Sequence, residues 1–259
     1  MSHIAQAFKE PGRAALIGYV TVGYPSLDAT LKAVTVLEEA GCDIVELGIP
    51  FSDPLADGVT IQRASHQALE SGVTPTVCIE TAAQLRLRVS LPLLFMTYYN
   101  PVLRFGLESF CQASAKAGID GLIVPDLPPE EGQTLEAACT AKGLDLVYLL
   151  APNSTPERIA LVAQHSRGFI YLVSLTGVTG ARESLSADLS GFVATVRRYA
   201  RQPLCIGFGV SSPEQARQFA SLADGVIVGS RLIQLIEEDT SLKSLRDFVA
   251  SLRKALDKG

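Results

Sequence analysis

Short apolar segments that alternate with helix-forming segments are the feature that most constrains the fold of this chain. The helical segments carry start signals, such as the pair Thr155–Pro156 and Ser212 followed by Pro213. The apolar segments show little polar alternation, which is typical of parallel strands buried on both faces. We therefore predict eight strands, at Leu16–Val22, Asp43–Ile49, Leu93–Tyr98, Gly121–Val124, Asp145–Leu150, Phe169–Val173, Leu204–Phe208 and Gly225–Val228.

The number of strands favours a closed barrel over an open sheet. Eight βα units in about 250 residues match a (β/α)8 barrel, and no Gly/Ser/Pro-rich linker divides the 259 residues. An open doubly wound sheet usually carries G-x-G-x-x-G after its first strand, where this chain has Val-Gly-Tyr-Pro at 22–25. We expect one α/β domain over residues 1–259, a (β/α)8 TIM barrel with an extra N-terminal helix in 1–11 below the barrel and a closing helix in 241–257.

Charge and composition disfavour several classes of protein. The chain has 22 basic and 27 acidic residues, a net charge of −5, so it lacks the basic surface that nucleic-acid binding requires. No apolar run approaches the ~20 residues that span a bilayer, and no secretory signal is recognisable. The five cysteines are widely spaced without a C-x-x-C pair, unlike a disulfide framework or a zinc site. We expect a cytoplasmic protein, or an organellar one after processing, with no nucleic-acid or membrane partner.

The second predicted strand ends in acidic residues, at the place where barrel enzymes carry their chemistry. Alternation along this strand turns Glu46 into the barrel if Val45 and Leu47 face the helices. A buried, unpaired carboxyl has a raised pKa and can act as a general acid or base near neutral pH. The following loop adds Asp53 and Asp57, and two acids in different environments can take different roles. The alternatives are a Glu46 that pairs with a neighbouring cation or lies outside the barrel, and loop acids that only form turns.

Glycine-bearing loops end three consecutive strands, and such loops often bind phosphate through backbone N–H groups. They lie at residues 174–182, 207–211 and 228–231. One loop of this kind is weak support, because glycine also serves ordinary turns, but three favour a phosphate-bearing substrate. The first loop is long and rich in small residues, so a mobile lid is a second interpretation of it.

Lysine and histidine are missing from the predicted strand ends. The seven lysines fall in helices, turns or chain ends, which disfavours imine-forming aldolases and pyridoxal-phosphate enzymes. His3, His66 and His165 also lie away from the predicted strand ends. Their positions disfavour a zinc-dependent aldolase and a triose-phosphate-type isomerase. We therefore expect a phosphate-bearing substrate handled by carboxylates, with no metal and no cofactor.

One long motif carries a resemblance to a known family. Residues 46–58 read Glu-Leu-Gly-Ile-Pro-Phe-Ser-Asp-Pro-Leu-Ala-Asp-Gly, followed by Thr-Ile-Gln at 60–62. This segment closely resembles the signature of the tryptophan synthase alpha subunit family, and residues 20–25, 96–101, 124–128, 174–180, 207–209 and 229–230 resemble the same family. The resemblance implies a carbon–carbon lyase that cleaves indole-3-glycerol phosphate to indole and glyceraldehyde 3-phosphate in tryptophan biosynthesis. It implies a retro-aldol step without metal or cofactor.

The resemblance also implies roles for individual residues. Glu46 would protonate C3 of indole and take the proton of the hydroxyl whose carbon becomes the aldehyde. Asp57 would accept the indole N–H and stabilise the developing positive charge. Tyr171 matches a family tyrosine near the reacting centre, with a barrel-filling aromatic as the alternative. Val59 stands where the family commonly has proline, so the loop loses a restraint on φ.

The other site residues follow from the same resemblance. The phosphate would bind to Gly180, Gly209, Gly229 and Ser230. The indole pocket would be lined by Tyr19, Met96, Ile123 and Phe208, with plain core as the alternative for each. Thr179 matches a lid threonine that in the family meets the loop aspartate, which would link closure of the lid to Asp57.

The family resemblance further implies a partner. A beta subunit carrying pyridoxal phosphate would receive the indole within an αββα heterotetramer, with Asp53, Pro54, Asn100 and the loop at 174–182 nearest to it. A charged fraction of 19%, against a typical ~25%, is in keeping with an interface. Two alternatives stay open: a stand-alone indole-3-glycerol-phosphate lyase, and a phosphate-binding regulatory subunit without turnover. The intact Glu46 and Asp57 speak against the second, and the missing strand-end lysine disfavours a neighbouring isomerase or synthase of the pathway.

Overall fold

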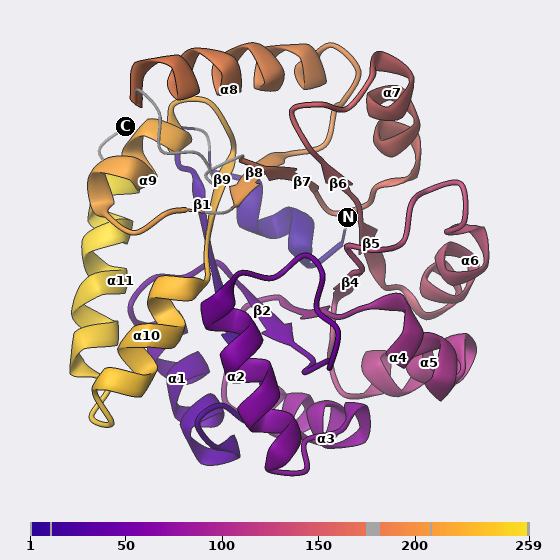
Figure 1. The fold of residues 1–259 in the computed structure, drawn as a ribbon, viewed down its shortest axis with the longest axis vertical. Helices are drawn as coiled ribbons and strands as arrows, with labels where there is room; N and C mark the ends of the chain where they lie inside the picture. Colours follow the sequence, from indigo (N-terminus) through magenta and orange to yellow (C-terminus); the bar gives the residue numbers. More distant parts are fainter. Residues whose placement is uncertain (1, 11, 175–181, 208, 258–259) are drawn as a thin grey trace.

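The computed structural model describes residues 2–10, 12–174, 182–207 and 209–257, and within them every strand is parallel to its neighbours (Figure 1). The strands form one sheet in the order β5-β4-β3-β2-β1-β9-β8-β7-β6. Their bounds are β1 Ala15–Thr21, β2 Ile44–Gly48, β3 Leu93–Met96, β4 Gly121–Ile123, β5 Asp145–Val147, β6 Leu149–Leu150, β7 Ile170–Val173, β8 Leu204–Gly207 and β9 Gly225–Val228. The described strands lie at the eight segments expected from the sequence, with end points that differ by at most two residues.

The fifth expected strand is divided in two, which explains why the described strands number nine rather than eight. Its first part, β5, pairs with β4, and its second part, β6, pairs with β7. Tyr148 lies between them; its N–H donates to Ser166 Oγ at 3.1 Å, and its carbonyl accepts from the N–H of Tyr171 at 3.0 Å. Because β5 and β6 follow one another directly, the sheet closes on itself and the expected (β/α)8 barrel is confirmed.

Helices form a ring outside the strands (Figure 1). Two expected start signals are confirmed: Thr155 accepts from the N–H of Arg158 at 3.3 Å and Ser212 from that of Gln215 at 3.3 Å. Ser26 caps a third helix in the same way and accepts from the N–H of Ala29 at 3.1 Å. The bounds of the described helices are α1 Leu27–Glu39, α2 Val59–Glu70, α3 Pro75–Arg86, α4 Tyr99–Phe105, α5 Leu107–Lys116, α6 Gln133–Lys142, α7 Pro156–His165, α8 Arg182–Arg197, α9 Pro213–Ala220, α10 Ser230–Glu238 and α11 Lys243–Leu256. In the ranges that the structure describes, no helix has the length and apolar character needed to cross a membrane.

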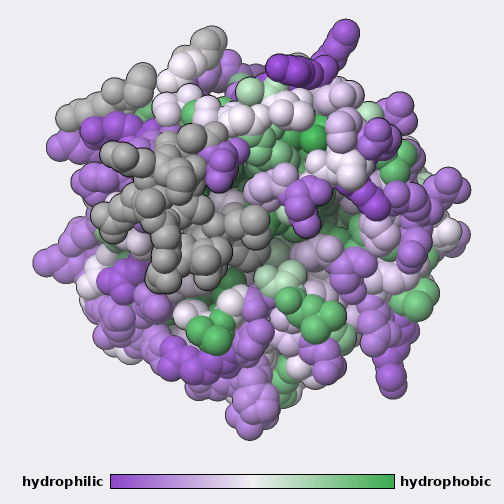
Figure 2. Space-filling model, turned by 45° about the horizontal axis from the view of Figure 1, so that its top comes forward, coloured by the Kyte–Doolittle hydropathy of each residue, from purple (hydrophilic) through white to green (hydrophobic). Residues whose placement is uncertain are grey.

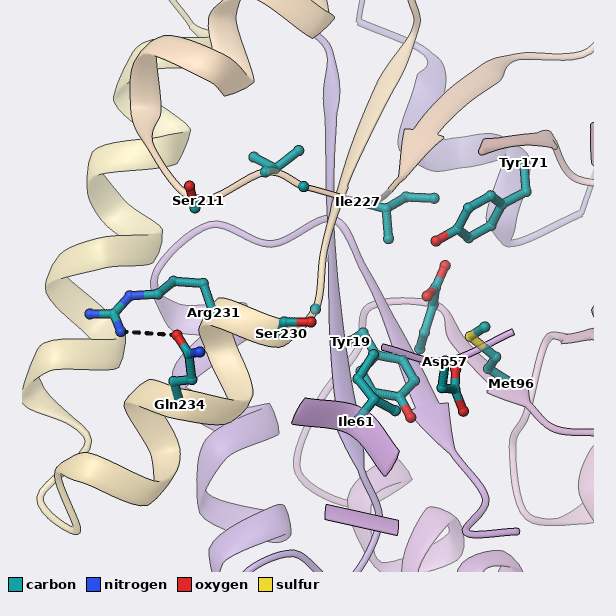
Figure 3. A pocket seen from close by; sticks show the side chains of 14 residues that line it. Tyr19, Asp57, Ile61, Met96, Tyr171, Ser211, Ile227, Ser230, Arg231 and Gln234 are labelled. Carbon is teal, nitrogen blue, oxygen red and sulfur yellow. Dashed lines mark hydrogen bonds between the residues drawn. The ribbon is translucent and has the colours of Figure 1, made fainter. Parts of the chain in front are cut away.

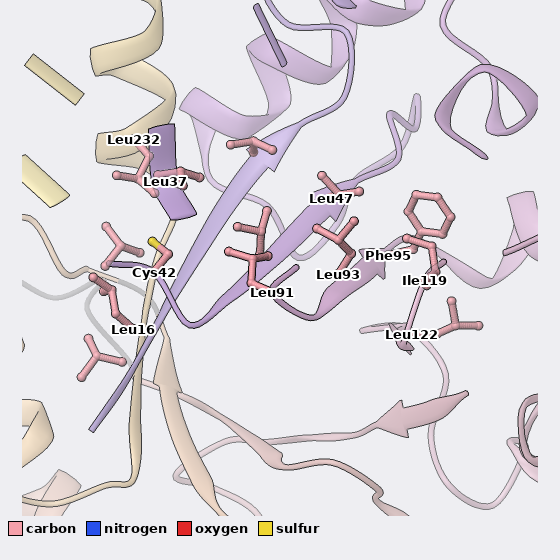
Figure 4. Close-up of a cluster of buried hydrophobic side chains, with 14 of the residues drawn as sticks. Leu16, Leu37, Cys42, Leu47, Leu91, Leu93, Phe95, Ile119, Leu122 and Leu232 are labelled. Carbon is pink, nitrogen blue, oxygen red and sulfur yellow. The ribbon is translucent and has the colours of Figure 1, made fainter. Parts of the chain in front are cut away.

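Alternating side chains of the strands form two separate apolar cores. The outer core lies between the sheet and the helices; Figure 4 shows Leu37 of α1 beside Leu232 of α10, and Leu47 of β2 beside Leu93 of β3. The inner core fills the barrel with residues of the other parity, among them Ile17, Ile44, Leu94, Ile123, Val147 and Ile227. Since Val45 and Leu47 belong to the outer core, Glu46 between them points into the barrel, as expected.

The two expected terminal helices are present. The N-terminal one is a short 3-10 helix, Ile4–Phe8, whose Ile4 is fully buried and whose Phe8 ring lies 6.1 Å from that of Phe169. These contacts belong to the inner core, so the helix covers the N-terminal end of the barrel. The closing helix α11 buries Leu245, Val249, Leu252 and Leu256 against the outer core. One end of the barrel is therefore filled by apolar side chains, which leaves the C-terminal ends of the strands for a site.

Candidate active site

A cavity of about 310 Å³ opens at the C-terminal ends of the strands (Figure 3). Side chains of β1, β2, β3, β7 and β9 line it together with the loops after β2, β8 and β9 and the start of α10. It brings together Tyr19, Glu46, Asp57, Met96, Tyr171, Gly209, Gly229 and Ser230, all of which the sequence singled out. Residues up to 211 positions apart in the chain thus share one cavity, because parallel strands place all their C-terminal ends on the same side.

Glu46 is the most unusual group in this cavity. Its side chain is fully buried, its neighbours in the sheet register are Tyr19 and Leu94, and neither carboxyl oxygen has a hydrogen-bond partner among the described residues. Burial disfavours the charged form and raises the pKa of Glu46 from 4.5 to about 8. A carboxyl in this state is protonated at neutral pH and can give a proton to a bound molecule.

Asp57 lies in the loop after β2 and differs from Glu46 in its surroundings. Burial raises the pKa of Asp57 from 3.8 to about 6, and a hydrogen bond with the hydroxyl of Tyr98 opposes this rise. The same hydroxyl accepts the N–H of Ala56 at 3.0 Å, and the ring of Tyr98 stacks on Phe51 at 5.2 Å. At neutral pH the cavity therefore holds one protonated and one ionised carboxyl.

Tyr98 is a residue that the sequence analysis did not single out. It lies between β3, which ends at Met96, and α4, within the 96–101 segment that resembles the family, and supports the loop that carries Asp57. The available signal was its place at a strand end, where an aromatic side chain with a hydroxyl group can hold a neighbouring loop.

Two tyrosines lie across glycines of the neighbouring strands. A Cβ atom on Gly48 would come within 2.1 Å of the Tyr19 hydroxyl, and one on Gly207 within 2.2 Å of the Tyr171 hydroxyl. Burial raises the pKa of Tyr171, and the nearby Glu46 adds to this rise, so the phenol stays neutral. Because Gly48 and Gly207 have no side chains, the rings of Tyr19 and Tyr171 have room in the cavity wall.

The opposite end of the cavity presents backbone groups. Gly209 has a φ of +84°, a conformation that favours glycine. Gly229 is the N-cap of α10 and Ser230 is its first residue, so the free N–H groups of the first helical turn face this end. Backbone N–H groups at a helix start form a ready site for an anion.

Some expected site residues are not placed in the cavity wall. Gly180, Thr179 and Phe208 lie outside the described residues. Ile123 ends β4 and is fully buried in the inner core, rather than at the cavity surface. The cavity is also lined by residues that were not named as individual site residues, namely Ile61, Val210, Ser211, Ile227, Arg231 and Gln234. Val210, Ser211 and Arg231 lie in the two loops expected to bind phosphate, and Ile61 lies in the Thr-Ile-Gln segment of the family motif, which was the available signal.

Neither lysine nor histidine lines the cavity in the part of the chain that the structure describes. The histidines lie elsewhere: His3 contacts Asp120 at 2.9 Å, His165 contacts Glu136 at 2.9 Å, and His66 lies 3.3 Å from Glu70. Within the described ranges, no group of three His, Cys, Asp or Glu side chains is arranged to hold a metal ion.

The residues expected to face a partner lie on the loops of the same barrel end. Asp53 and Asn100 are exposed and Pro54 is half-buried. Beside them Leu55 is 91% exposed, and Val59 is 82% exposed as the first residue of α2. That first helical position is where a proline is best tolerated, so Val59 keeps the helix start that a family proline would support.

The fold and the cavity define a (β/α)8 barrel enzyme with acidic groups at its strand ends. The family described as tryptophan synthase alpha chain matches residues 5–257. The tryptophan synthase alpha chain of Dehalococcoides mccartyi is 58% identical over 99% of this chain and 100% of its own length. That of Chloroflexus aggregans is 53% identical over 92% of this chain and 90% of its own.

Solved structures give the same result. A chain of tryptophan synthase from M. tuberculosis in its aminoacrylate-bound form superposes with a TM-score of 0.90 at 40% identity, covering 99% of this chain and 100% of that one. The tryptophan synthase subunit alpha of Legionella pneumophila superposes with a TM-score of 0.92 at 34% identity, over 100% of both chains. The chain belongs to the tryptophan synthase alpha chain family.

Proposed function

We propose that this chain is the alpha subunit of a tryptophan synthase and cleaves indole-3-glycerol phosphate to indole and glyceraldehyde 3-phosphate. The observation that carries this function is the pairing of a fully buried Glu46, with a pKa raised to about 8, and Asp57, with a pKa raised to about 6, in one cavity with the start of α10. A retro-aldol lyase for this substrate needs an acid, a separate anion and a phosphate site, and the protonated Glu46, the ionised Asp57 and the start of α10 support these three roles.

Glu46 is the proposed acid and base. The protonated carboxyl gives its proton to C3 of the indole ring, which makes an indolenine cation. The resulting carboxylate takes the proton of the hydroxyl on the adjacent carbon; that carbon becomes the aldehyde, and the electron pair of the broken carbon–carbon bond returns to the ring. Glu46 gives one proton and takes one back, so its carboxyl is protonated again at the end of the reaction.

Asp57 is the proposed anion that stabilises the cationic ring. It accepts the indole N–H, and its negative charge gains importance as positive charge develops on the ring. Its pKa of about 6 keeps it ionised at neutral pH. Tyr171 and Tyr19, with Met96, would hold the apolar ring near Glu46, while Gly209, Gly229 and Ser230 would bind the phosphate.

The family implies a beta subunit as partner, and we propose that it docks at the loops after β2 and β3 in an αββα heterotetramer. Exposed apolar side chains support this surface. Besides Leu55 and Val59, they include Leu103 of α4, which is 54% exposed. The face shown in Figure 2 is mostly hydrophilic with separate hydrophobic clusters. Pyridoxal phosphate would belong to the partner; the absence of a cofactor from this chain, its single catalytic domain and its cytoplasmic location stay predictions.

Indole release from indole-3-glycerol phosphate by the purified chain tests the function. We expect a low rate that rises steeply when the beta subunit of the same genome is added. Glu46→Gln should remove turnover and leave binding of a phosphate monoester intact. A high rate that ignores the beta subunit would instead favour a stand-alone lyase, and no indole under either condition would overturn the proposal.

The partner surface has a separate test. Leu55→Ser should weaken stimulation by the beta subunit and leave the unstimulated rate unchanged, because the side chain is 91% exposed in the isolated chain. Leu87→Ser is the matched control: Leu87 is 88% exposed but directly follows α3, at the opposite end of the barrel. Equal effects of the two substitutions would contradict docking at the strand 2 and 3 loops.

A further inference from the structure

Arg231 ends the 228–231 loop, and neither the sequence nor the family comparison gives its side chain a role. Among the described side chains that line the cavity, it is the only one with a permanent positive charge. The rest of the cavity carries two carboxyl groups, and the whole chain has a net charge of −5. An anionic substrate therefore meets one full positive charge on its way to the site, next to Ser230.

The position of Arg231 in its helix is unfavourable for a cation. Arg231 is the second residue of α10, where the helix dipole places partial positive charge. Negative side chains are favoured at this position, and a local conflict of this kind is typical of functional sites. A bound dianion would neutralise both the partial positive charge of the helix start and the charge of the guanidinium.

The contacts that Arg231 makes within the protein are weak. Its guanidinium donates to Gln234 Oε1 at 3.2 Å and lies 3.4 Å from Glu238 Oε1. The side chains of Arg231 and Glu238 are 34% and 57% exposed, and pairs of this kind contribute little to stability. Figure 3 shows the guanidinium turned towards Gln234 and away from Tyr171 and Asp57.

We propose that Arg231 is an additional phosphate-binding residue, whose guanidinium leaves Gln234 and Glu238 and pairs with the phosphate of the substrate. The inference rests on the proposed function, in which the phosphate lies at Gly209, Gly229 and Ser230. A guanidinium offers two parallel N–H donors to a phosphate and stays charged at every relevant pH, so it favours the dianion over weaker anions.

The role is one of binding rather than of chemistry. Glu46 and Asp57 act on the indole end of the substrate, while Arg231 would hold the phosphate equally in the ground state and in the transition state. Loss of such an interaction raises KM and leaves kcat nearly unchanged. This split separates Arg231 from a residue that only supports the fold near the reacting groups.

Calorimetric titration with sn-glycerol 3-phosphate tests the proposal without relying on lyase activity. Arg231→Gln should weaken binding of this probe about tenfold at low salt and reduce the salt dependence of binding, and Arg231→Lys should keep most of the affinity. Arg217→Gln is the matched control, because this exposed residue of α9 makes the same change of charge outside the cavity wall. It should bind the probe like the wild type.

Three results would overturn the proposal. Equal affinity of Arg231→Gln and the wild type, with parallel salt dependence, would exclude Arg231 while leaving the phosphate site standing. If Arg217→Gln weakened binding of the probe equally, the loss of affinity would result from the change of overall charge and not from Arg231. A wild-type chain that does not bind the probe would overturn the phosphate site and the role of Arg231 together. If Arg231→Gln lost the native circular-dichroism spectrum, Arg231→Ala would take its place, with the same loss of affinity of about tenfold expected and wild-type affinity overturning the proposal.

Discussion

The hydroxyl of Tyr98 accepts the backbone N–H of Ala56 at 3.0 Å, one residue before Asp57. A side chain at the end of β3 thereby holds the loop that follows β2. The same hydroxyl also forms a hydrogen bond with the carboxylate of Asp57, and the ring is fixed by stacking on Phe51. The position and the pKa of Asp57 therefore both depend on one phenol group.

Tyr98→Phe should lower kcat about 3- to 10-fold, because Ala56 loses its acceptor and Asp57 loses a hydrogen bond. The pKa of Asp57 should rise, since the bond with Tyr98 opposes the effect of burial. The measurement is the pH profile of indole release, in which the acidic limb should move to higher pH. Tyr99→Phe is the control, and an acidic limb that stays in place for Tyr98→Phe would contradict the coupling.

The dependence of kcat/KM on pH should be bell-shaped. Activity should rise as Asp57 ionises with a pKa of about 6 and fall as Glu46 loses its proton with a pKa of about 8. Initial rates of indole release between pH 5 and 9.5 give the profile. Asp57→Asn should reduce kcat/KM about 10²-fold and remove the acidic limb. A profile that still rises above pH 9 would contradict a protonated Glu46 as the acid.

Glu46→Gln should make the protein more stable at alkaline pH. The folded-state pKa of Glu46 is raised from 4.5 to about 8, so the folded chain holds this proton more tightly than the unfolded chain does. Its contribution to stability is complete below pH 4.5 and is lost as the pH rises to 8. We expect the free energy of unfolding in urea to exceed that of the wild type by about 1–3 kcal/mol at pH 8, and the difference to vanish near pH 4.5. A difference that does not change with pH would show that Glu46 is not buried as a neutral acid.

Gly207→Ala should destabilise the protein by about 1–3 kcal/mol and displace Tyr171, because the new methyl group would lie 2.2 Å from the tyrosine hydroxyl. Gly191→Ala in α8 is the matched control, since nothing lies within 4 Å of its added Cβ. That control should be stabilising by about 0.5–1 kcal/mol, as expected for glycine in a helix. Thermal unfolding of the two variants at pH 7 makes the comparison, and similar shifts in Tm would contradict the packing of Tyr171 on Gly207.

Much of the barrel could be predicted from the sequence because its signals are local. Buried parallel strands read as apolar runs, and caps such as Ser212 act within one helical turn. The inward direction of Glu46 also followed from local alternation, because Val45 and Leu47 fix which face meets the helices. The division of the fifth strand at Tyr148 could not be predicted from local alternation, because it depends on which neighbouring strand each half pairs with.

The parts of the site that could not be predicted depend on contacts between distant segments. Tyr98 supports Asp57 across 41 positions, and Arg231 lines a cavity whose acidic groups, Glu46 and Asp57, come from the first half of the chain. Ile123 has the parity of the cavity residues and pairs in register with Met96, but it is fully buried and does not line the cavity, because alternation gives the face of a strand and not which side chains border the open space. The strand-end positions already pointed to the acids and the glycine-bearing loops, the family resemblance implied their roles, and those roles stay predictions.

The divided strand at Tyr148 also gives the barrel a seam. Each other junction between neighbouring strands is a direct ladder, whereas the part of the chain before Tyr148 is bound to β4 and the part after it to β7. Tyr148 itself is held by backbone hydrogen bonds with Ser166 and Tyr171 and by a hydrogen bond that its hydroxyl donates to Glu136 Oε1 at 2.7 Å. Local opening begins where ladder hydrogen bonds are few, so we expect the barrel to open first at this seam. The ring of strands is continuous in space, and along the chain it is assembled from two arcs, β1–β5 and β6–β9, that meet at Tyr148 and again at the ladder between β1 and β9.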